Sequence, residues 1–424
     1  MNEIQVGLRE ASCEDDYDPD SMSVEAARKF IHRFLKPVSG YEQVHIRQAL
    51  NRVLAERLIS PLDVPAHINS AMDGYAIRNA DLPQEGQGCL KVIGSAFAGR
   101  PYSGKVAAGE CVRIMTGAVL PEGADTVVIQ EKVKLVDDTI LLDTKPKRGE
   151  NIREKGEDLR QGEKVLGPGR LLRPADVGLL ASLGINEIRV YRRLRIAFFS
   201  TGDELKSIGS PLEEGQIYDS NRYTLYGMLK NLNVEVMDMG VVRDAPEAIE
   251  EALVTAAASA DVILTSGGVS VGEADFIREL LQKLGEVVFW KIAMKPGRPL
   301  AYGKIGKAHF FGLPGNPVSV MVTFYQFVQN AIKVLMGETG VTPPPTFRVP
   351  CLTTLKKSPG RTEFQRGVLS CNENGEWVVR VTGAQGSGIL RSMSEANCFI
   401  VLPEAQGSVA AGDFVEIQLL EGIL

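Results

Sequence analysis

A glycine-rich turn in the middle of this 424-residue chain has the residue types of an anion-binding loop. The apolar run 262–265 leads into Ser266, Gly267, Gly268 and Ser270, and Asp275 follows. Glycine lacks a Cβ atom, so the backbone can take a positive φ and bring its N–H groups close to phosphate-like oxygens. The helical spacing after Asp275 places a helix N-terminus just beyond the turn, where its partial positive charge favours anions.

The carboxylates that end this turn predict a cation as well. Glu273 and Asp275 would repel a phosphate unless a cation lay between them, so they indicate a divalent metal, magnesium. The turn has neither the Gly-Lys-Ser/Thr ending of a P-loop nor the glycine spacing of a dinucleotide fingerprint. Taken alone, the segment is explained equally well as a tight strand-to-helix connection with solvated acids.

Two charged segments are further candidates for a binding site. Asp203 and Glu204 follow the apolar run 196–200, and capping of a helix by Asp203 is an alternative explanation for them. Residues 290–299 carry Lys291, Lys295 and Arg298 together with two prolines that should keep the segment out of regular structure. Three cations so close together predict a clamp for an oxyanion, with a solvated basic loop as the alternative.

A proline- and glycine-rich loop is the last of these segments. It consists of Pro314, Gly315, Asn316 and Pro317 and follows the apolar run 310–313. A helix should begin right after Pro317, so its free N–H groups would face the same region as the other loops. Turn chemistry by itself is also a sufficient explanation of this segment.

The elements that must position these loops alternate between strand and helix patterns from residue 195 to about residue 337. Such alternation indicates a doubly wound, mostly parallel α/β sheet, in which ligands bind beyond the carboxyl ends of the strands. The acidic, glycine-rich and proline-rich loops all fall at such ends, so they should meet at one crevice. The expected strands are 196–200, 234–237, 262–265, 287–290 and 310–313, and the expected helices are 221–231, 246–259, 275–284 and 318–335.

Changes in residue pattern and composition along the chain predict several domains. Ser23 can cap a helix over residues 24–35, which a Lys-Pro pair ends. Short β-branched runs broken by Gly and Pro are typical of β domains, and three consecutive prolines form a stiff linker after the α/β domain. The expected parts are a loose acidic tail (1–22), a small β domain (62–158), the α/β domain (191–340) and a C-terminal β domain (346–424).

Composition excludes several classes of function. Lys and Arg total 47 against 53 Asp and Glu, a net charge of −6, so neither nucleic acid nor an anionic membrane surface is an expected partner. Six scattered cysteines and four histidines argue against a zinc site or a disulfide framework, and they suit a reducing compartment. With no signal-peptide pattern and no apolar run of membrane-spanning length, a cytoplasmic location is expected.

Five motifs make the chain similar to a known family. They are Asn-Ser-Ala-Met-Asp-Gly-Tyr-Ala (69–76), Met-Thr-Gly-Ala (115–118), Ser-Thr-Gly-Asp-Glu-Leu (200–205), Ser-Gly-Gly-Val-Ser-Val-Gly-Glu-Ala-Asp (266–275) and Leu-Pro-Gly-Asn-Pro-Val-Ser (313–319). With these motifs, in the family's order, the chain closely resembles the MoeA family of molybdopterin molybdenumtransferases, which includes the E domain of gephyrin. The resemblance covers nearly the whole chain, from about residue 23 to the C-terminal β domain.

The resemblance implies a reaction and a set of site residues. Family members insert molybdenum from molybdate into the dithiolene of adenylylated molybdopterin, with Mg²⁺ present, and release AMP and the molybdenum cofactor. By resemblance, magnesium would be held by Asp244 and Asp275. The substrate-binding residues would be Ser266, Gly267, Gly268, Ser270, Pro314, Gly315, Asn316 and Pro317; the molybdate-binding residues Lys295, Arg298, Pro299, Arg361 and Ser387; and the catalytic residues Asp73, Thr116, Asp158, Glu204, Lys291 and Lys295.

The resemblance also implies an architecture. Residues 23–61 and 159–190 would form an elongated linking and dimerisation domain of helical and mixed structure, with the β domain 62–158 inserted into it. The C-terminal domain would be barrel-like. The inserted domain of one subunit would close the crevice of the other, which gives a homodimer with composite active sites. A molybdopterin adenylyltransferase and the molybdoenzymes that accept the cofactor are further expected partners.

Two positions depart from the family pattern, and two other functions are weighed. Arg298 stands where many members have Lys, and Ala384 stands where His is common, so a ligand contact by residue 384 is not carried over. The first alternative is the related adenylyltransferase, which would consume ATP rather than release AMP. The second is a gephyrin-like scaffold that anchors a receptor peptide, but no region here resembles gephyrin's additional N-terminal module or long linker.

Overall fold

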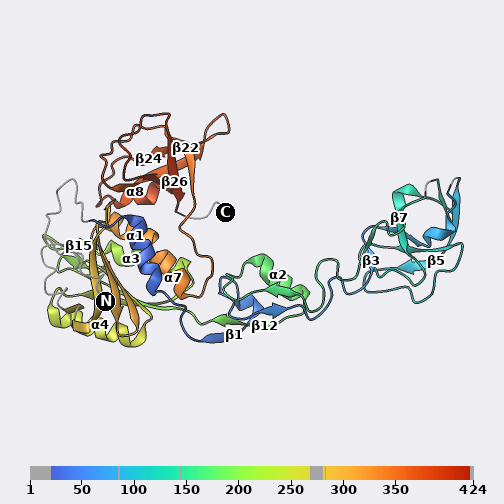
Figure 1. Ribbon diagram of the computed structural model, residues 1–424, viewed down its shortest axis with the longest axis horizontal. Coiled ribbons are helices and arrows are strands. Elements are labelled where there is room, and N and C mark those ends of the chain that lie inside the picture. Colours follow the sequence, from blue (N-terminus) through green and yellow to red (C-terminus); the bar gives the residue numbers. More distant parts are fainter. Residues whose placement is uncertain (1–20, 85, 144, 268–279, 282, 421–424) are drawn as a thin grey trace. The chain divides into compact units, whose positions relative to one another are not determined.

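The computed structural model describes residues 21–420 except positions 85, 144, 268–279 and 282 (Figure 1). The chain forms two compact units, one of Met1–Glu42, Asn51–Val53 and Val190–Leu424 and the other of Gln43–Leu50 and Leu54–Arg189. The predicted fold class is confirmed, because an α/β sheet, a separate β sheet and a C-terminal β-rich part are all present. No helix in the described part of the chain is long and apolar enough to cross a membrane. The tail predicted for residues 1–22 lies outside the description up to residue 20.

A six-stranded sheet with strand order β16-β13-β17-β21-β20-β18 is the centre of the first unit. The four strands from β16 to β21 are parallel, whereas β20 runs antiparallel to both of its neighbours. The sequence did not predict β20, although the other five strands were expected. The strands are β13 (Arg195–Thr201), β16 (Glu235–Val242), β17 (Val262–Ser266), β18 (Gly285–Lys291), β20 (Pro299–Ile305) and β21 (Ala308–Leu313).

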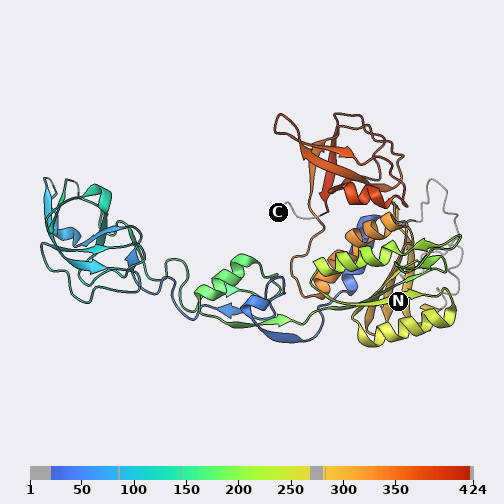
Figure 2. The same ribbon diagram turned by 180° about the vertical axis from the view of Figure 1, so that it is seen from behind.

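Helices cover both faces of this sheet (Figure 1, Figure 2). Helix α4 (Pro246–Ser259) packs on the face that carries Ala197, Phe199 and Ile263, all of which are fully buried. Helix α3 (Ser220–Asn231) and the helix that follows β21 lie on the opposite face. Because they are covered on both faces, the inner strands β13, β17 and β21 are predominantly apolar, which is why their runs could be recognised.

The helix predicted for 318–335 is confirmed as three consecutive pieces. They are α6 (Pro317–Thr323), the π-helical turn η4 (Phe324–Val328) and α7 (Gln329–Leu335). The helices predicted for 221–231 and 246–259 are confirmed as α3 and α4, whereas most of the one predicted for 275–284 lies outside the described residues. Ser23 caps α1 (Val24–Phe34) as expected, because its hydroxyl accepts a hydrogen bond of 3.2 Å from Ala26 N–H.

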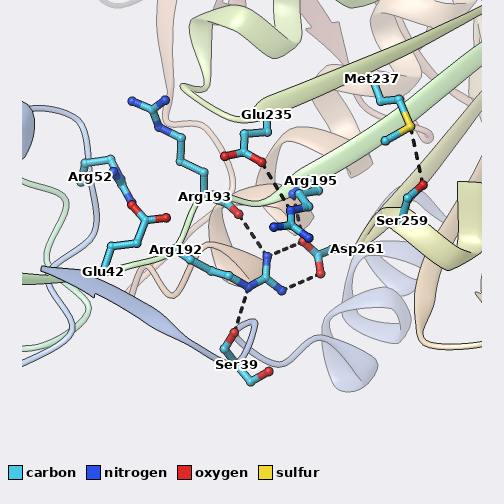
Figure 3. Close-up of polar contacts among 10 residues, drawn as sticks. All are labelled: Ser39, Glu42, Arg52, Arg192, Arg193, Arg195, Glu235, Met237, Ser259 and Asp261. Atoms are coloured by element: carbon cyan, nitrogen blue, oxygen red, sulfur yellow. Dashed lines mark hydrogen bonds and ion pairs between the residues drawn. The ribbon is translucent and has the colours of Figure 1, made fainter. Parts of the chain in front are cut away.

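A cluster of ion pairs fixes the amino-terminal edge of the sheet, at the opposite end of the strands from the predicted crevice (Figure 3). The two terminal nitrogens of Arg192 donate to the two carboxylate oxygens of Asp261 at 2.7 Å each, and Arg195 N–H donates to the same carboxylate at 2.9 Å. Partial burial acts to raise the pKa of Asp261, but the hydrogen bonds from Arg192 and Arg195 hold that pKa below its ordinary value. Arg192 Nε also donates to Ser39 O, which ties the segment after α1 to the segment that leads into β13.

The C-terminal strands form the barrel-like sheet that the resemblance implies. Its order is β19-β23-β25-β26-β22, and β24 also pairs with β23, over residues Gly367 to Cys371. A bridge between Cys351 and Val379 joins the end of β22 to β24 and closes the sheet around an apolar core. The elements are β19 (Met294–Lys295), β22 (Thr346–Pro350), β23 (Thr362–Cys371), β24 (Trp377–Val381), α8 (Leu390–Glu395), β25 (Cys398–Leu402) and β26 (Phe414–Leu419).

The second unit is built around a different six-stranded sheet, with order β7-β4-β6-β5-β9-β8. Buried side chains such as Ile77, Ile114 and Ile140 form its core. Helix α2 (Pro174–Ser182) and three small two-stranded sheets complete the mixed part of the chain. The strands of this unit are β2 (Leu58–Ile59), β3 (Asn69–Ser70), β4 (Gly74–Ile77), β5 (Gly88–Ala96), β6 (Glu110–Ile114), β7 (Thr126–Ile129), β8 (Lys134–Val136), β9 (Thr139–Leu142), β10 (Ile152–Arg153) and β11 (Lys164–Leu166). Strands β1 (Tyr41–His45) and β12 (Glu187–Tyr191) each have residues in both units.

Candidate active site

The carboxyl ends of three neighbouring parallel strands bring the predicted loops together. Strand β17 lies between β13 and β21, and Ser266 at its end pairs with Ser200 on one side and Leu313 on the other. The acidic, glycine-rich and proline-rich loops therefore leave the sheet side by side. This confirms the prediction that they share one edge, which is where ligands bind in such sheets.

Gly267 shows why the turn after β17 requires glycine. Its φ is +93°, and a Cβ atom there would lie 2.5 Å from the carbonyl oxygen of Thr201. Its N–H donates to Leu313 O at 3.2 Å, so the turn is held between the ends of β13 and β21. The predicted site residues Gly268, Ser270 and Asp275, and Glu273 with them, lie outside the described residues.

Asn221 connects the proline-rich loop to β17. Its side-chain amide donates to Ser266 Oγ at 2.8 Å and to Gly315 O at 2.6 Å. Asp219 places Asn221 at the start of α3, because the Asp219 carboxylate caps the helix by accepting from Arg222 N–H. The sequence analysis missed Asn221, since an Asp-Ser-Asn helix start is common and only its spatial neighbours mark it.

The acidic loops after β13 and β16 also meet. Asp203 Oδ1 accepts a long hydrogen bond of 3.4 Å from Asp244 N–H. The Glu204 carboxylate folds back over Gly202, where an added Cβ would lie 2.6 Å from Glu204 Oε2. The alternative in which Asp203 caps a helix is wrong, because a turn and then the two-residue strand β14 (Leu205–Lys206) follow it.

The prediction that two prolines keep residues 290–299 out of regular structure is wrong for much of the segment. Lys291 ends β18, Lys295 lies in β19 and Pro299 begins β20. The backbone finds partners from distant parts of the chain: Met294–Lys295 pairs with Thr362 and Glu363, and Met22 N–H donates to Lys291 O at 2.9 Å. Such nonlocal pairing leaves no pattern in the segment itself.

The same pairing brings the C-terminal residues to the basic segment. Lys295 Nζ lies 3.7 Å from Glu363 Oε1, and Arg361 is two residues before Glu363. Gly297, with φ +96°, packs so closely on α6 that a Cβ would lie 2.6 Å from Thr323 Oγ1. Glu363, which is only 6% exposed, is a second residue that the sequence analysis missed.

Ser387 lies at the other end of α6. Its carbonyl accepts from Val318 N–H at 3.0 Å, next to Pro317. Arg366, 1% exposed, donates to the carbonyl of Gly386 at 3.1 Å and to Ser392 Oγ, and so fixes the backbone beside Ser387. Burial lowers the pKa of Arg366 to about 10, which still leaves it protonated at neutral pH. Helix α6 therefore contacts both segments: its Thr323 end packs against Gly297 of the basic segment, and its Val318 end binds the Ser387 loop.

Two of the three site residues predicted in the β domain lie together in the second unit. Asp73 Oδ1 accepts from both the N–H and the hydroxyl of Thr116, each at 2.7 Å. These hydrogen bonds, the backbone one first, hold the pKa of Asp73 below its ordinary value. Asp158 is in a separate segment, exposed to solvent, and its N–H donates to Val64 O at 2.9 Å.

The donor set for a metal is small. Among the residues that the structure describes, no group of three or more His, Cys, Asp or Glu side chains could hold a metal ion. Mg²⁺ commonly uses only one or two carboxylates and completes its shell with water and substrate phosphates. The adjoining Asp203 and Asp244 loops fit that mode, and Asp275 lies outside the described residues.

Comparison with known proteins agrees with this arrangement. The chain matches the family models for the MoeA N-terminal region, domains I and II (residues 22–184), a probable molybdopterin binding domain (197–334) and the MoeA C-terminal region, domain IV (348–420). It is 48% identical over 384 residues to the molybdopterin molybdenumtransferase of Haemophilus influenzae, covering 90% of this chain and 95% of that one. The corresponding enzyme of a Nostoc species is 36% identical, with 89% and 88% covered.

Solved structures give the same result. The crystal structure of the molybdopterin biosynthesis MoeA protein from Pyrococcus horikoshii superposes with a TM-score of 0.82 at 32% identity, covering 94% of this chain and 100% of that one. The match therefore extends over both units and not only over the widespread α/β sheet. The chain belongs to the MoeA family.

Proposed function

We propose that this protein inserts molybdenum from molybdate into adenylylated molybdopterin and releases AMP and the molybdenum cofactor. Membership of the MoeA family makes it a transferase of molybdenum cofactor biosynthesis and supports a metal-dependent enzyme. The observation that carries the finer proposal is the shared edge of the sheet, where acidic loops, a glycine turn and a basic segment lie in sequence along neighbouring strands.

Each part of this edge suits one part of the substrates. The glycine turn at Gly267 can bring backbone N–H groups to the phosphate oxygens. Lys295 and Arg298, with Pro299, would receive molybdate, together with Arg361 and Ser387 from the C-terminal sheet. Lys291 adds a third cation at the end of β18. A tetrahedral dianion would thus be bound by cations that lie in strands, as Lys291 and Lys295 do, or directly before them, as Arg298 and Arg361 do, and not by a long basic loop.

Magnesium is part of the proposal. Asp244 would hold it, with Glu204 beside the nucleotide and Asp275 as the further carboxylate that the resemblance implies. When bound, the ion would neutralise charge on the phosphate oxygens. The chain's own groups would orient the two substrates and exclude water, so positioning and electrostatics would account for the catalysis and no covalent nucleophile is required.

The residues of the second unit enter through dimerisation. Asp73, Thr116 and Asp158 would be supplied to the crevice by a second copy of the chain, giving a homodimer with composite sites. The protein would work in the cytoplasm, next to the adenylyltransferase that makes its substrate and the molybdoenzymes that take its product. Mixing two impaired variants tests the composite site: when Asp73→Asn and Lys295→Ala homodimers are mixed and allowed to exchange subunits, AMP release at subsaturating molybdate should rise, because a heterodimer contains one intact site. The absence of a rise would contradict the composite site.

The decisive experiment measures AMP release from adenylylated molybdopterin with and without molybdate. We expect release to depend on both molybdate and Mg²⁺ and to proceed without ATP. Consumption of ATP with unmodified molybdopterin would instead identify an adenylyltransferase. No release in the presence of all the substrates would refute the proposed function.

A further inference from the structure

The start of helix α3 contains buried oxygen atoms that the mechanism above does not use. Asp219 is 1% exposed and Asn221 is 9% exposed, and both lie at the carboxyl edge of the sheet. Because the Asn221 amide nitrogen donates to Ser266 Oγ and Gly315 O, the orientation of the carboxamide is fixed. Its oxygen, Oδ1, is then directed away from these two partners.

Asn221 Oδ1 and Asp219 Oδ2 have no hydrogen-bond partner in the described part of the chain, although both atoms are inaccessible to solvent. Ser200, which pairs with Ser266 in the neighbouring strand, has a buried hydroxyl that likewise finds no partner among the residues that the structure describes. Nearly all buried polar atoms in folded proteins are hydrogen-bonded, so each exception calls for a specific explanation, of which a functional role is one. Two such atoms on nearby residues at the start of α3 and a third on Ser200, which pairs with the Ser266 that Asn221 contacts, therefore point to a ligand that brings its own donors.

The chemistry of the three atoms specifies the ligand. A carboxylate oxygen and an amide oxygen can only accept, so they require adjacent N–H donors, whereas a serine hydroxyl can also donate. The aminopyrimidinone edge of a pterin presents an exocyclic amine, a ring N–H and a carbonyl in a row. Adenine presents a single amine flanked by ring nitrogens that accept. The set of atoms matches the pterin and not the adenine.

We infer that Asp219 and Asn221 bind the pterin edge of adenylylated molybdopterin and set specificity for it, an inference that rests on the proposed function. Asp219 accepts with the carboxylate oxygen not used in capping α3, and Asn221 accepts with the oxygen opposite its fixed amide nitrogen. The phosphates then lie toward the turn at Gly267, whose backbone adjoins Ser266.

The test compares the binding of two probes, adenylylated molybdopterin and AMP, by titration calorimetry. Asp219→Asn is the most informative variant, because Asn caps helices as well as Asp does but presents an amide N–H where the pterin N–H would lie. We expect Asp219→Asn and Asn221→Ala to weaken adenylylated molybdopterin about tenfold or more and to change AMP binding less than twofold. Asn231→Ala, at the exposed far end of the same helix, is the matched control and should change neither.

The outcomes separate this inference from its alternatives. Equal loss of both probes would mean that the residues hold the loops or bind adenine, and it would overturn the inference. A defect of Asp219→Asn that disappears in EDTA would show a metal ligand and would also overturn it. In turnover, KM for adenylylated molybdopterin should rise with kcat nearly unchanged. If the wild-type protein releases no AMP, the proposed function fails; if it does and the variants behave like wild type, only the pterin assignment fails.

Discussion

Replacing Gly267 by alanine should disable the site with little damage elsewhere. The backbone at Gly267 has φ +93°, where an L-residue is disfavoured by about 1–2 kcal/mol. The new Cβ would also lie 2.5 Å from Thr201 O, so the two segments must separate by about 0.9 Å to reach an ordinary contact near 3.4 Å. Forcing such overpacking costs a further 1–3 kcal/mol or so. The total of about 2–5 kcal/mol can be relieved only by moving the turn away from β13, which displaces the proposed phosphate site.

Gly209 offers a matched control for this experiment. Its φ is +89°, but nothing lies within 4 Å of where a Cβ would be, so Gly209→Ala carries the strain without the clash. We expect kcat/KM for molybdate-dependent AMP release to fall about a hundredfold or more in Gly267→Ala, since displacements of an ångström in a binding loop have effects of this size. Gly209→Ala should keep its activity within about twofold. If the two variants show the same activity, the argument from close approach is refuted.

Three further predictions concern charged groups. Asp261→Asn should lower the free energy of unfolding at pH 7 by about 1–3 kcal/mol. Because the pKa of Asp261 is lower in the folded state, the wild-type protein should lose that contribution to stability as the pH falls below about 4, the ordinary Asp value. Denaturant titrations at several pH values should show this loss in the wild-type protein and not in the variant. The exposed ion pair of Glu25 with Lys29 is the control, and Glu25→Gln should not change the free energy of unfolding measurably. Thr116→Val removes the hydroxyl hydrogen bond to Asp73 but keeps the backbone one, so the pKa of Asp73, measured by NMR titration, should rise part of the way to its ordinary value. An unchanged pKa would contradict the hydrogen bonds from Thr116 as the cause of the lowered value. Lys295→Ala should raise KM for molybdate about tenfold or more, because it removes a charge-assisted contact of about 1.5–3 kcal/mol. KM for adenylylated molybdopterin should not change similarly. The control is Lys307→Ala, in the exposed turn between β20 and β21, which should change neither KM.

The parallel strands of the α/β sheet could be predicted because their sequence pattern is local. Strands such as 196–200 and 262–265 are predominantly apolar, since helices cover both faces of the sheet, and each is followed by a loop that contains glycine. Strand β20 has no such pattern: it begins with Pro299 and contains Gly303, and both residue types are unfavourable inside strands. It forms because β18 and β21 supply hydrogen bonds on both of its sides.

The candidate site was predictable in the same uneven way. Loop residues such as Gly267 and Pro314 follow strand ends, so their place at one edge followed from the order of the elements. Asn221 and Glu363 could not be singled out, because each is defined by a partner far away in sequence: Gly315 is 94 positions from Asn221, and β23 brings Glu363 to Lys295. A polar residue that becomes functional through nonlocal contacts looks like any other polar residue in its own segment.

The order of strands explains how a chain of net charge −6 could accommodate both the proposed metal site and the proposed oxyanion site at one edge. The acids Asp203 and Asp244 follow β13 and β16 at one end of the sheet, and the cations Lys291 and Arg298 adjoin β18 and β20 at the other. Strands β17 and β21 lie between them, and strands are spaced about 4.8 Å apart, so the two sets of charges stand more than 10 Å apart. At that distance the two charged groups do not neutralise each other, because solvent and salt screen most of their attraction. Since Lys291 and Pro299 belong to strands of the same sheet, the separation is fixed by the sheet and not by a flexible loop. The strand pairing of the basic segment, which the sequence suggested was irregular, thus keeps the proposed dianion site apart from the proposed cation site at the other end of the edge.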